Sequence, residues 1–188
     1  MSSLFARNLD EHRSVLATLA ALDEQVQAAA ALLSSTLRSG GKVMFCGNGG
    51  SAADCQHLAA ELIGRLVQDR RPLAAMALST DTSALTCIAN DYAFEAVFAR
   101  QVQGLGRPGD CLVGISTSGQ SANVLAAVDA ARAIGMQTVG LLGRDGGRLR
   151  DAVDCAVVVP SSSTARIQEM HILIGHTLCG LVEEALGL

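Results

Sequence analysis

Five short apolar runs alternate along the chain with segments of helical character. Strands and helices that alternate in this way are typical of a parallel sheet with helices on both faces. The alternation therefore predicts an α/β fold, a three-layer sandwich of the flavodoxin-like or Rossmann-like type whose five-stranded parallel sheet is flanked by helices. The predicted strands are Lys42–Cys46, Leu73–Leu78, Cys111–Ile115, Thr138–Leu142 and Cys155–Val159.

The helical segments complete the predicted domain. Helices are expected over Ser51–Val67 and Ser121–Ile134, because each begins at a serine suited to capping and carries apolar residues at helical spacing. A longer helical segment, Leu4–Leu37, precedes the first strand, and a final helix runs from about Arg166 to Leu186. We therefore expect a single domain over 1–188, with an α/β core at 41–188 and an N-terminal helical segment at 1–40 that serves oligomerisation.

The composition narrows the classes of function. Apolar residues make up 49% of the 188-residue chain and charged residues only 17%, so another subunit is expected to cover part of the surface. A net charge of −4 and only 3% aromatic residues argue against nucleic-acid binding. Six cysteines without a C-x-x-C pair indicate buried thiols in a reducing compartment. With no signal-peptide pattern and no bilayer-spanning apolar run, the sequence predicts a cytoplasmic protein that binds no membrane.

The segment from Asp110 to Asn123 joins an apolar strand directly to a helix through a turn rich in hydroxyl groups. The free N–H groups at the start of a helix favour an anion, and Gly119 lets the backbone approach it closely. An ordinary helix cap at Ser121 is the alternative, but the turn offers more hydroxyl groups than a cap requires. The turn therefore predicts a phosphate-binding loop. Its hydroxyl donors are Ser116, Thr117, Ser118 and Ser121.

A second glycine-rich loop, at 46–52, also joins a strand to a helix. Its spacing fits the dinucleotide fingerprint G-x-G-x-x-G/A, but no acidic residue follows at the end of the second strand, and Gly-Lys-Ser/Thr is absent. The loop is therefore expected to bring its backbone close to a small polar ligand, with Asn48 and Ser51 contacting hydroxyl groups.

His57 and Glu61 lie four residues apart on the helix that this loop opens, so both side chains point to one face. An imidazole and a carboxylate at this spacing are an acid–base pair, two metal ligands, or simply a solvated ion pair.

The last helix adds Gln168, His171 and His176, in or beside an apolar run. His176 is either a histidine of the core or a ligand, because an imidazole in an apolar setting needs a partner. With His57 and Glu61, the residues Gln168 and His176 complete a donor set that suits a borderline divalent ion such as zinc. Gln168 and His176 are, however, about 12 Å apart along a regular helix. Either the helix start is irregular or the site draws on two subunits.

These motifs, in this order, resemble those of the bacterial phosphoheptose isomerases over nearly the whole chain. They are Cys-Gly-Asn-Gly-Gly-Ser at 46–51, His57 with Glu61, Ala-Asn-Asp at 89–91, Gly-Ile-Ser-Thr-Ser-Gly-x-Ser at 114–121, and Arg-Ile-Gln-Glu-x-His at 166–171 followed by His176. The chain is also similar to the wider sugar-isomerase (SIS) domain class. The resemblance implies an aldose–ketose isomerase that converts sedoheptulose 7-phosphate to D-glycero-D-manno-heptose 7-phosphate through an enediol, the first step of nucleotide-activated heptose synthesis. It further implies a homotetramer with active sites where subunits meet.

The resemblance also assigns roles to matching positions. It implies one zinc ion per subunit, with His57, Glu61, Gln168 and His176 as ligands. It implies that Glu61 and His176 transfer protons. The implied substrate contacts are Asn48, Gly49, Gly50, Ser51, Glu61, Asn90, Asp91, Ser116, Thr117, Ser118, Ser121 and Gln168. Two positions depart from the family pattern without removing a catalytic group: Ala165, where some members have an acidic residue, and Gln120, where Asn or Lys is common.

Two alternatives to an isomerase remain open on the sequence. Paralogues of the same fold bind the bacterial replication initiator, and the segment 165–171 resembles them closely. Those proteins lack the imidazole of His176 and have an altered Ser-Thr-Ser-Gly loop, whereas this chain keeps both. A sugar-phosphate sensor without catalysis is the second alternative, but such sensors usually carry an attached regulatory domain.

Overall fold

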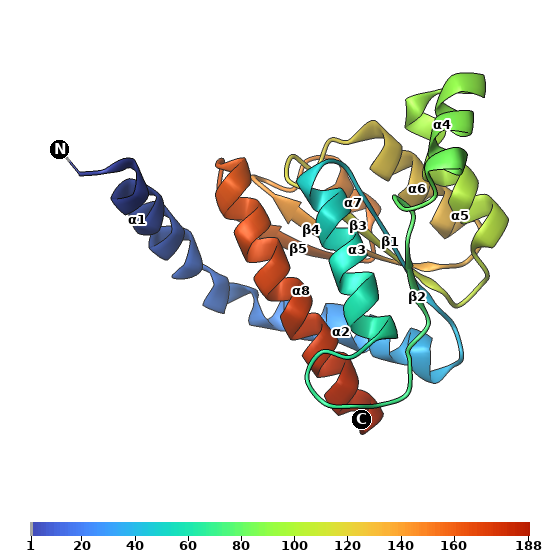
Figure 1. Ribbon diagram of the computed structural model, residues 1–188, viewed down its shortest axis with the longest axis horizontal. Helices are drawn as coiled ribbons and strands as arrows, with labels where there is room; N and C mark the ends of the chain where they lie inside the picture. Colours follow the sequence, from blue (N-terminus) through green and yellow to red (C-terminus); the bar gives the residue numbers. More distant parts are fainter. Residues whose placement is uncertain (1) are drawn as a thin grey trace.

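The computed structural model describes residues 2–188, and its centre is a parallel sheet with helices on both faces (Figure 1). The strands are β1 (Val43–Gly47), β2 (Ala75–Ala77), β3 (Cys111–Ser116), β4 (Gln137–Gly143) and β5 (Cys155–Val159). They lie in the order β2-β1-β3-β4-β5, and every pairing is parallel. The predicted α/β class and five-stranded parallel sheet are thereby confirmed.

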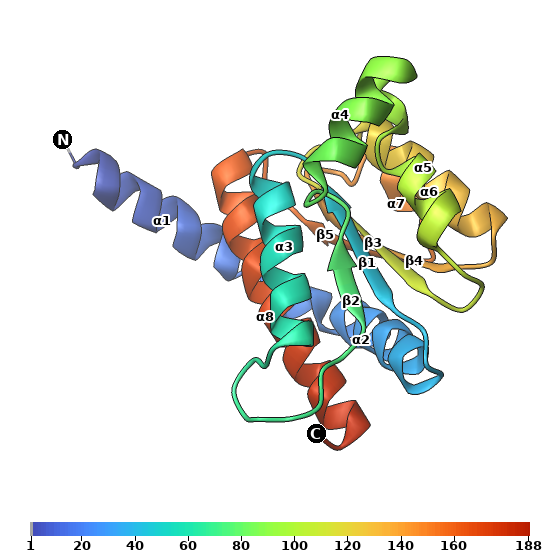
Figure 2. The ribbon, with the colours of Figure 1, turned by 45° about the vertical axis from the view of Figure 1, so that its right-hand side comes forward.

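Helices cover both faces of the sheet (Figure 2). Apolar side chains of α2, α3 and α8 pack on one face together with Val43 and Phe45 of β1. The other face, which carries Met44 and Cys46, packs against α4 to α7. This division follows from the pleat, because successive side chains of a strand point to opposite faces. The helices are α1 (Leu4–Leu16), α2 (Asp23–Arg38), α3 (Gly50–Ile63), α4 (Thr82–Asp91), α5 (Ala99–Leu105), α6 (Ala122–Ala133), α7 (Leu149–Ala152) and α8 (Thr164–Leu186), with 3-10 turns η1 (Leu19–Leu22) and η2 (Phe94–Ala96).

The N-terminal segment is not the single helix that the sequence predicted. It breaks after Leu16, passes through η1, and resumes as α2 at Asp23. The Thr18 hydroxyl donates a 2.7 Å hydrogen bond to the carbonyl of Val15, and such local bonds compete with regular helix. Acidic residues in the first turn of α2 favour a new helix start there. As a result α1 projects from the body of the domain (Figure 1), with none of its residues buried.

The helix after β1 is shorter than predicted, ending at Ile63 rather than Val67. The guanidinium of Arg70 closes its end, donating hydrogen bonds of 2.8 Å to the carbonyl of Glu61 and 2.8 Å to that of Leu62. Arg70 is in turn held by the carboxylate of Glu183 on α8, at 2.8 Å. A buried arginine can satisfy the open carbonyls of a helix C-terminus, and here it fixes the turn that carries Glu61.

Sequence analysis assigned no helix between the second and third strands, where the structure has α4 and α5. Asp81 caps α4, its side chain accepting a 2.9 Å hydrogen bond from the backbone of Ala84. This Asp-x-x-Ala start is a regular helix signal. Sequence analysis missed this helix because it lies in a stretch of small residues with little apolar periodicity.

Four cysteines, Cys46, Cys55, Cys111 and Cys179, are buried, as the sequence predicted. Burial raises the pKa of the Cys46 and Cys179 thiols to about 12, which keeps them protonated. For Cys87 the prediction of a buried thiol was wrong, because that side chain is exposed on α4. No helix within residues 2–188 combines the length and the apolar character needed to cross a membrane.

Candidate active site

Two predicted loops meet at the point where the strand order reverses. From β1 the chain turns through α3 to β2 on one side, whereas from β3 it turns through α6 to β4 on the other. In open α/β sheets, ligands bind in the crevice at the carboxyl ends of the two strands that flank such a point. Asn48 after β1 and Asn123 at the start of α6 join the loops here with two reciprocal amide hydrogen bonds of 2.8 Å. The fold therefore brings together, at this point of the sheet, the two segments that the sequence singled out.

The segment 116–121, which we call the hydroxyl loop, is ordered by its own side chains. The Ser116 hydroxyl lies 2.9 Å from that of Ser121 and 3.5 Å from that of Ser118, and it accepts a 3.1 Å hydrogen bond from the backbone of Gly119. Ser121 stands at the N-cap of α6 but makes no side-chain capping bond. The alternative of an ordinary serine cap is therefore wrong. The hydroxyl of Ser121 does not accept a hydrogen bond from the N–H groups at the start of α6, so it does not compete with an anion for them.

Gly119 brings the hydroxyl loop against the loop that follows β4. Its φ is 64°, and a Cβ placed on it would lie 1.9 Å from the carbonyl oxygen of Gly146. The carbonyl of Gly119 accepts a 3.0 Å hydrogen bond from the backbone of Leu149. Only glycine fits both the conformation and the contact, so the shape of the hydroxyl loop depends on this residue.

The first loop contributes backbone and small side chains. Gly49 and Gly50 are exposed, and Gly49 has a φ of 58°. Ser51, in contrast, is 2% exposed and lies in the first turn of α3 beneath the loop. Of the predicted contacts in this loop, the backbone at 49–50 is therefore the part most open to a ligand.

His57, Glu61 and His176 converge on one cluster between α3 and α8. His57 Nε2 lies 2.8 Å from His176 Nε2 and 3.3 Å from Glu61 Oε1, and one ligand atom from each residue lies within 4.8 Å of the others. Two imidazole nitrogens and a carboxylate oxygen match the protein ligands of catalytic zinc sites, which leave one position open. Two facing Nε2 atoms also require one shared proton or a bound cation between them. The donor chemistry thus fits a zinc ion.

Gln168 lies at a different level of the same helix pair. A Cβ at Gly50 would come within 2.4 Å of Gln168 Nε2, so this amide rests on the first loop. Near the cluster, Gly175 faces Leu58, and its lack of a side chain lets the helices approach closely. Because α8 is a continuous helix from Thr164, an irregular helix start does not explain the separation of Gln168 from His176. The structure brings three of the predicted ligands together and places Gln168 against Gly50 of the first loop.

Asp54 is a site residue that sequence analysis missed. It lies on α3 with His57 and Glu61 at helical spacing, and one of its carboxylate oxygens is buried with no hydrogen-bond partner among the described residues. Burial raises the pKa of the Asp54 carboxyl, and the nearby imidazole of His57 partly offsets this. The repeat of polar residues at 54, 57 and 61 was the available signal.

Asn90 and Asp91, the second predicted substrate contact, are exposed at the end of α4. The Asn90 amide donates a 2.7 Å hydrogen bond to Asp91, and the Cys87 thiol lies 3.5 Å from the same carboxylate. No hydrogen bond or ion pair among residues 2–188 joins them to the His–Glu–His cluster. Within the described chain they therefore form a separate group.

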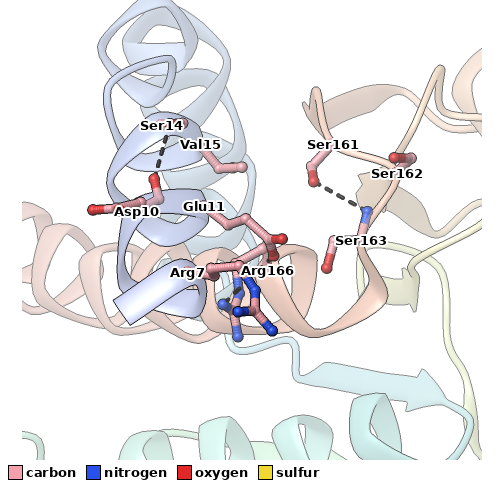
Figure 3. A pocket seen from close by; sticks show the side chains of 9 residues that line it. All are labelled: Arg7, Asp10, Glu11, Ser14, Val15, Ser161, Ser162, Ser163 and Arg166. Carbon is pink, nitrogen blue, oxygen red and sulfur yellow. Dashed lines mark hydrogen bonds and ion pairs between the residues drawn. The ribbon is translucent and has the colours of Figure 1, made fainter. Parts of the chain in front are cut away.

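A cavity lies elsewhere, between α1 and the loop before α8 (Figure 3). It has a volume of about 670 Å³, and Figure 3 shows Arg7 beside Arg166 with Ser161 and Ser163 across from them. Arg166 donates hydrogen bonds to the carbonyl of Asn8 at 2.7 Å and to the carboxylate of Glu169 at 2.6 Å. Asp10 and Glu11 line the same cavity and offset its guanidinium charge, so it lacks the positive field of a phosphate site.

His171, the remaining histidine of α8, is fully buried. Its Nε2 lies 2.9 Å from the carbonyl oxygen of Leu142, so Nε2 carries the proton, and Nδ1 has no partner among the described residues. Burial lowers the pKa of His171 to about 4, although the bond to Leu142 opposes the shift. The residue thus braces α8 against the end of β4 as a neutral imidazole.

The burial of His171 predicts a stability that depends on pH. In the unfolded chain a histidine has a pKa of about 6.5, so the unfolded state binds the proton more tightly. The free energy of unfolding should be highest above pH 6.5 and should fall by on the order of 3 kcal/mol as the pH approaches 4. Urea unfolding at several pH values measures this. The variant His171→Gln keeps a donor for Leu142 but does not titrate, so its profile should be flatter; parallel profiles would contradict the assignment.

Comparison with known proteins agrees with this geometry. The family model of the SIS domain matches residues 8–143, which is most of the chain. The chain therefore belongs to the SIS domain family, the class indicated by its sheet and by the loops at the strand ends.

Individual relatives of the chain define its family more narrowly than the domain model does. The phosphoheptose isomerase of a Nitratiruptor species is 64% identical over 79% of this chain and 80% of its own length. That of Helicobacter pylori is 52% identical over 97% of this chain and 96% of its own. The solved phosphoheptose isomerase of Neisseria gonorrhoeae superposes with a TM-score of 0.90 at 48% identity, covering 95% of this chain and 97% of its own. Within the SIS domain class, the chain is a member of the phosphoheptose isomerase family.

Proposed function

We propose that the protein is an aldose–ketose isomerase that converts sedoheptulose 7-phosphate to D-glycero-D-manno-heptose 7-phosphate. The observation that carries this proposal is the presence of two polar groups in one chain, the hydroxyl loop after β3 and the His57, Glu61 and His176 cluster between α3 and α8. His57 follows Gly50 by seven positions on α3, about 10 Å along the helix. A substrate with its phosphate at one end and its reacting carbons at the other needs two polar groups of this kind, set apart.

The chemistry follows from the groups present. Moving a carbonyl between C1 and C2 requires a base that takes a proton from one carbon and returns it to the other, through an enediol. Glu61 is the carboxylate positioned for this, and Arg70 holds the helix turn that carries it. His176 serves as the acid that exchanges a proton with the sugar oxygens, or assists ring opening. The imidazole of His57, 2.8 Å from that of His176, orients it.

Zinc is the proposed cofactor, one ion per subunit, held by His57, Glu61 and His176. Support comes from the donor set and from the facing Nε2 atoms, which a cation between them would satisfy. A bound zinc ion would polarise the substrate oxygen on which negative charge develops. Gln168 is a proposed fourth ligand only if it reaches the ion from another subunit; its contact with Gly50 favours the role of a substrate contact.

A homotetramer with active sites between subunits is the proposed assembly. α1 buries none of its residues, and Leu4 and Phe5 on it are 66% and 71% exposed. Apolar side chains of this size on a projecting helix favour packing against another copy. Asn90 and Asp91, which lie apart from the cluster, would then reach the site of a neighbouring subunit. A monomer with full activity would overturn this arrangement.

The proposed setting is the cytoplasm, and the proposed pathway is the supply of heptose for surface glycans such as lipopolysaccharide. Binding of the replication initiator is not favoured, because the relatives at 52–64% identity bear the isomerase name and the chain keeps His176 and the hydroxyl loop.

The direct test is turnover of sedoheptulose 7-phosphate by the purified protein. We expect NMR to show the aldoheptose phosphate appearing, with chelation lowering the rate and added zinc restoring it. An unphosphorylated heptulose should react far more slowly, because it lacks the group that the hydroxyl loop binds. Absence of product from the zinc-loaded, fully assembled protein would overturn the proposed function.

A further inference from the structure

Arg144 has a backbone conformation that arginine rarely adopts. Its φ is 59°, and it is the sole residue other than glycine with a positive φ among residues 2–188. It is the first central residue of a tight turn after β4, closed by a 2.9 Å hydrogen bond from the backbone of Gly146 to the carbonyl of Gly143. Turns with a positive φ at this position normally use glycine, because a Cβ is strained there. The chain uses glycine for positive φ at both 146 and 147 in the same loop.

Contacts within the subunit do not account for this arginine. Its side chain is exposed, and within the described part of the chain its guanidinium makes no hydrogen bond or ion pair. Its backbone N–H donates a 3.1 Å bond to the carbonyl of Ser161, a contact that glycine would make equally well. Strained residues of this kind cluster at functional sites, so the reason for the arginine lies in something that its side chain binds.

The position of the turn indicates what the side chain of Arg144 binds. Leu142 pairs with Ser116 across adjacent parallel strands, so Arg144 and the hydroxyl loop leave the sheet side by side. A Cβ on Gly143 would lie 2.6 Å from the carbonyl oxygen of Thr117. Neighbouring strands are about 4.8 Å apart, less than the length of an extended arginine side chain. The guanidinium is therefore within reach of an anion held by the hydroxyl loop.

The hydroxyl loop itself lacks a cation. The segment 110–123 contains neither Lys nor Arg, so its hydroxyl and N–H groups cannot neutralise a phosphate dianion, and the chain as a whole has a net charge of −4. We propose that Arg144 is a substrate-binding residue whose guanidinium pairs with the phosphate group held by the hydroxyl loop. Arginine suits this task because its planar donors match phosphate oxygens. This inference rests on the proposed function, since it completes the same phosphate site.

The test separates the backbone strain from the charge. Arg144→Gly removes both, so its melting temperature should rise by about 2–4 °C. Its KM for sedoheptulose 7-phosphate, and its inhibition constant for inorganic phosphate, should both rise about tenfold or more with the loss of a charge-assisted hydrogen bond. Arg144→Ala keeps the strain and should show the same loss of binding without the gain in stability. Arg144→Lys should retain most of the phosphate affinity, and kcat should change little in all three.

Arg148→Ala is the matched control. It removes the same charge from the same loop, at a residue whose φ of −65° is unstrained, and both constants should stay at the wild-type values. An Arg144→Gly variant that is more stable but binds phosphate as tightly as wild type would overturn the proposal, as would one whose sole defect is a change of subunit assembly. If the wild type fails to isomerise the sugar, calorimetric titration with inorganic phosphate still compares the variants, so the two failures are distinguishable.

Discussion

Replacing Glu61 with Gln is expected to lower kcat for heptose 7-phosphate isomerisation by about 10²–10⁴-fold, the contribution typical of a positioned general base. The amide keeps the size of the side chain but cannot accept the proton from carbon. KM should change little, because the hydroxyl loop, which we propose binds the phosphate, lies on other elements. Initial-rate kinetics at saturating zinc measure both constants.

The same variant separates the two roles of Glu61. A carboxylate 3.3 Å from His57 can bind zinc or act as a base, and zinc content measured by mass spectrometry shows whether the amide variant has lost the ion. We expect an inactive protein that still binds zinc through His57 and His176. Glu184→Gln, an exposed carboxylate further along α8, is the control and should be fully active. Near-normal turnover by Glu61→Gln would exclude this residue as the base.

The strands of the sheet could be predicted well, because each is marked by a short apolar run in the local sequence. β5 has the predicted bounds, Cys155–Val159, and β1 and β3 begin or end within one residue of the prediction. β2 is shorter, at Ala75–Ala77, because the backbone N–H of Leu73 donates to the carbonyl of Leu62 on α3 and not to the neighbouring strand. The break in the N-terminal helix was not predictable from composition, since the region between α1 and α2 has neither Gly nor Pro. The hydrogen bond from the Thr18 hydroxyl to the carbonyl of Val15 marks the break instead.

The sequence predicted which residues form the candidate site better than it predicted how they are arranged in space. The spacing of His57 and Glu61 placed both on one face, and His176 joins them because α3 and α8 pack together. The pairing of Asn48 with Asn123 joins positions far apart in the sequence, and no local pattern could reveal it. The strained turn at Arg144 was equally hidden, because φ at that residue is set by contacts of the neighbouring loops.

Replacing Gly119 with Ala is expected to destabilise the protein and to weaken phosphate binding. The left-handed conformation costs a residue with a Cβ about 1–2 kcal/mol. The added carbon would also overlap the carbonyl of Gly146, at 1.9 Å, which is backbone and cannot rotate away. Such overlaps add about 1–3 kcal/mol. We expect the free energy of unfolding to fall by about 2–5 kcal/mol in total, a large part of the 5–15 kcal/mol typical of a domain.

Gly104→Ala provides the comparison, because a Cβ there meets nothing within 4 Å and the residue lies in α5 with an ordinary φ. Alanine is favoured over glycine in a helix by about 0.5–1 kcal/mol, so this variant should be slightly more stable than wild type. KM should rise only in Gly119→Ala, because relief of the overlap requires the hydroxyl loop and the loop after β4 to separate. Wild-type stability and KM in Gly119→Ala would show that the two loops do not meet at this glycine. A loss of stability with unchanged KM would instead separate the packing role of the glycine from phosphate binding.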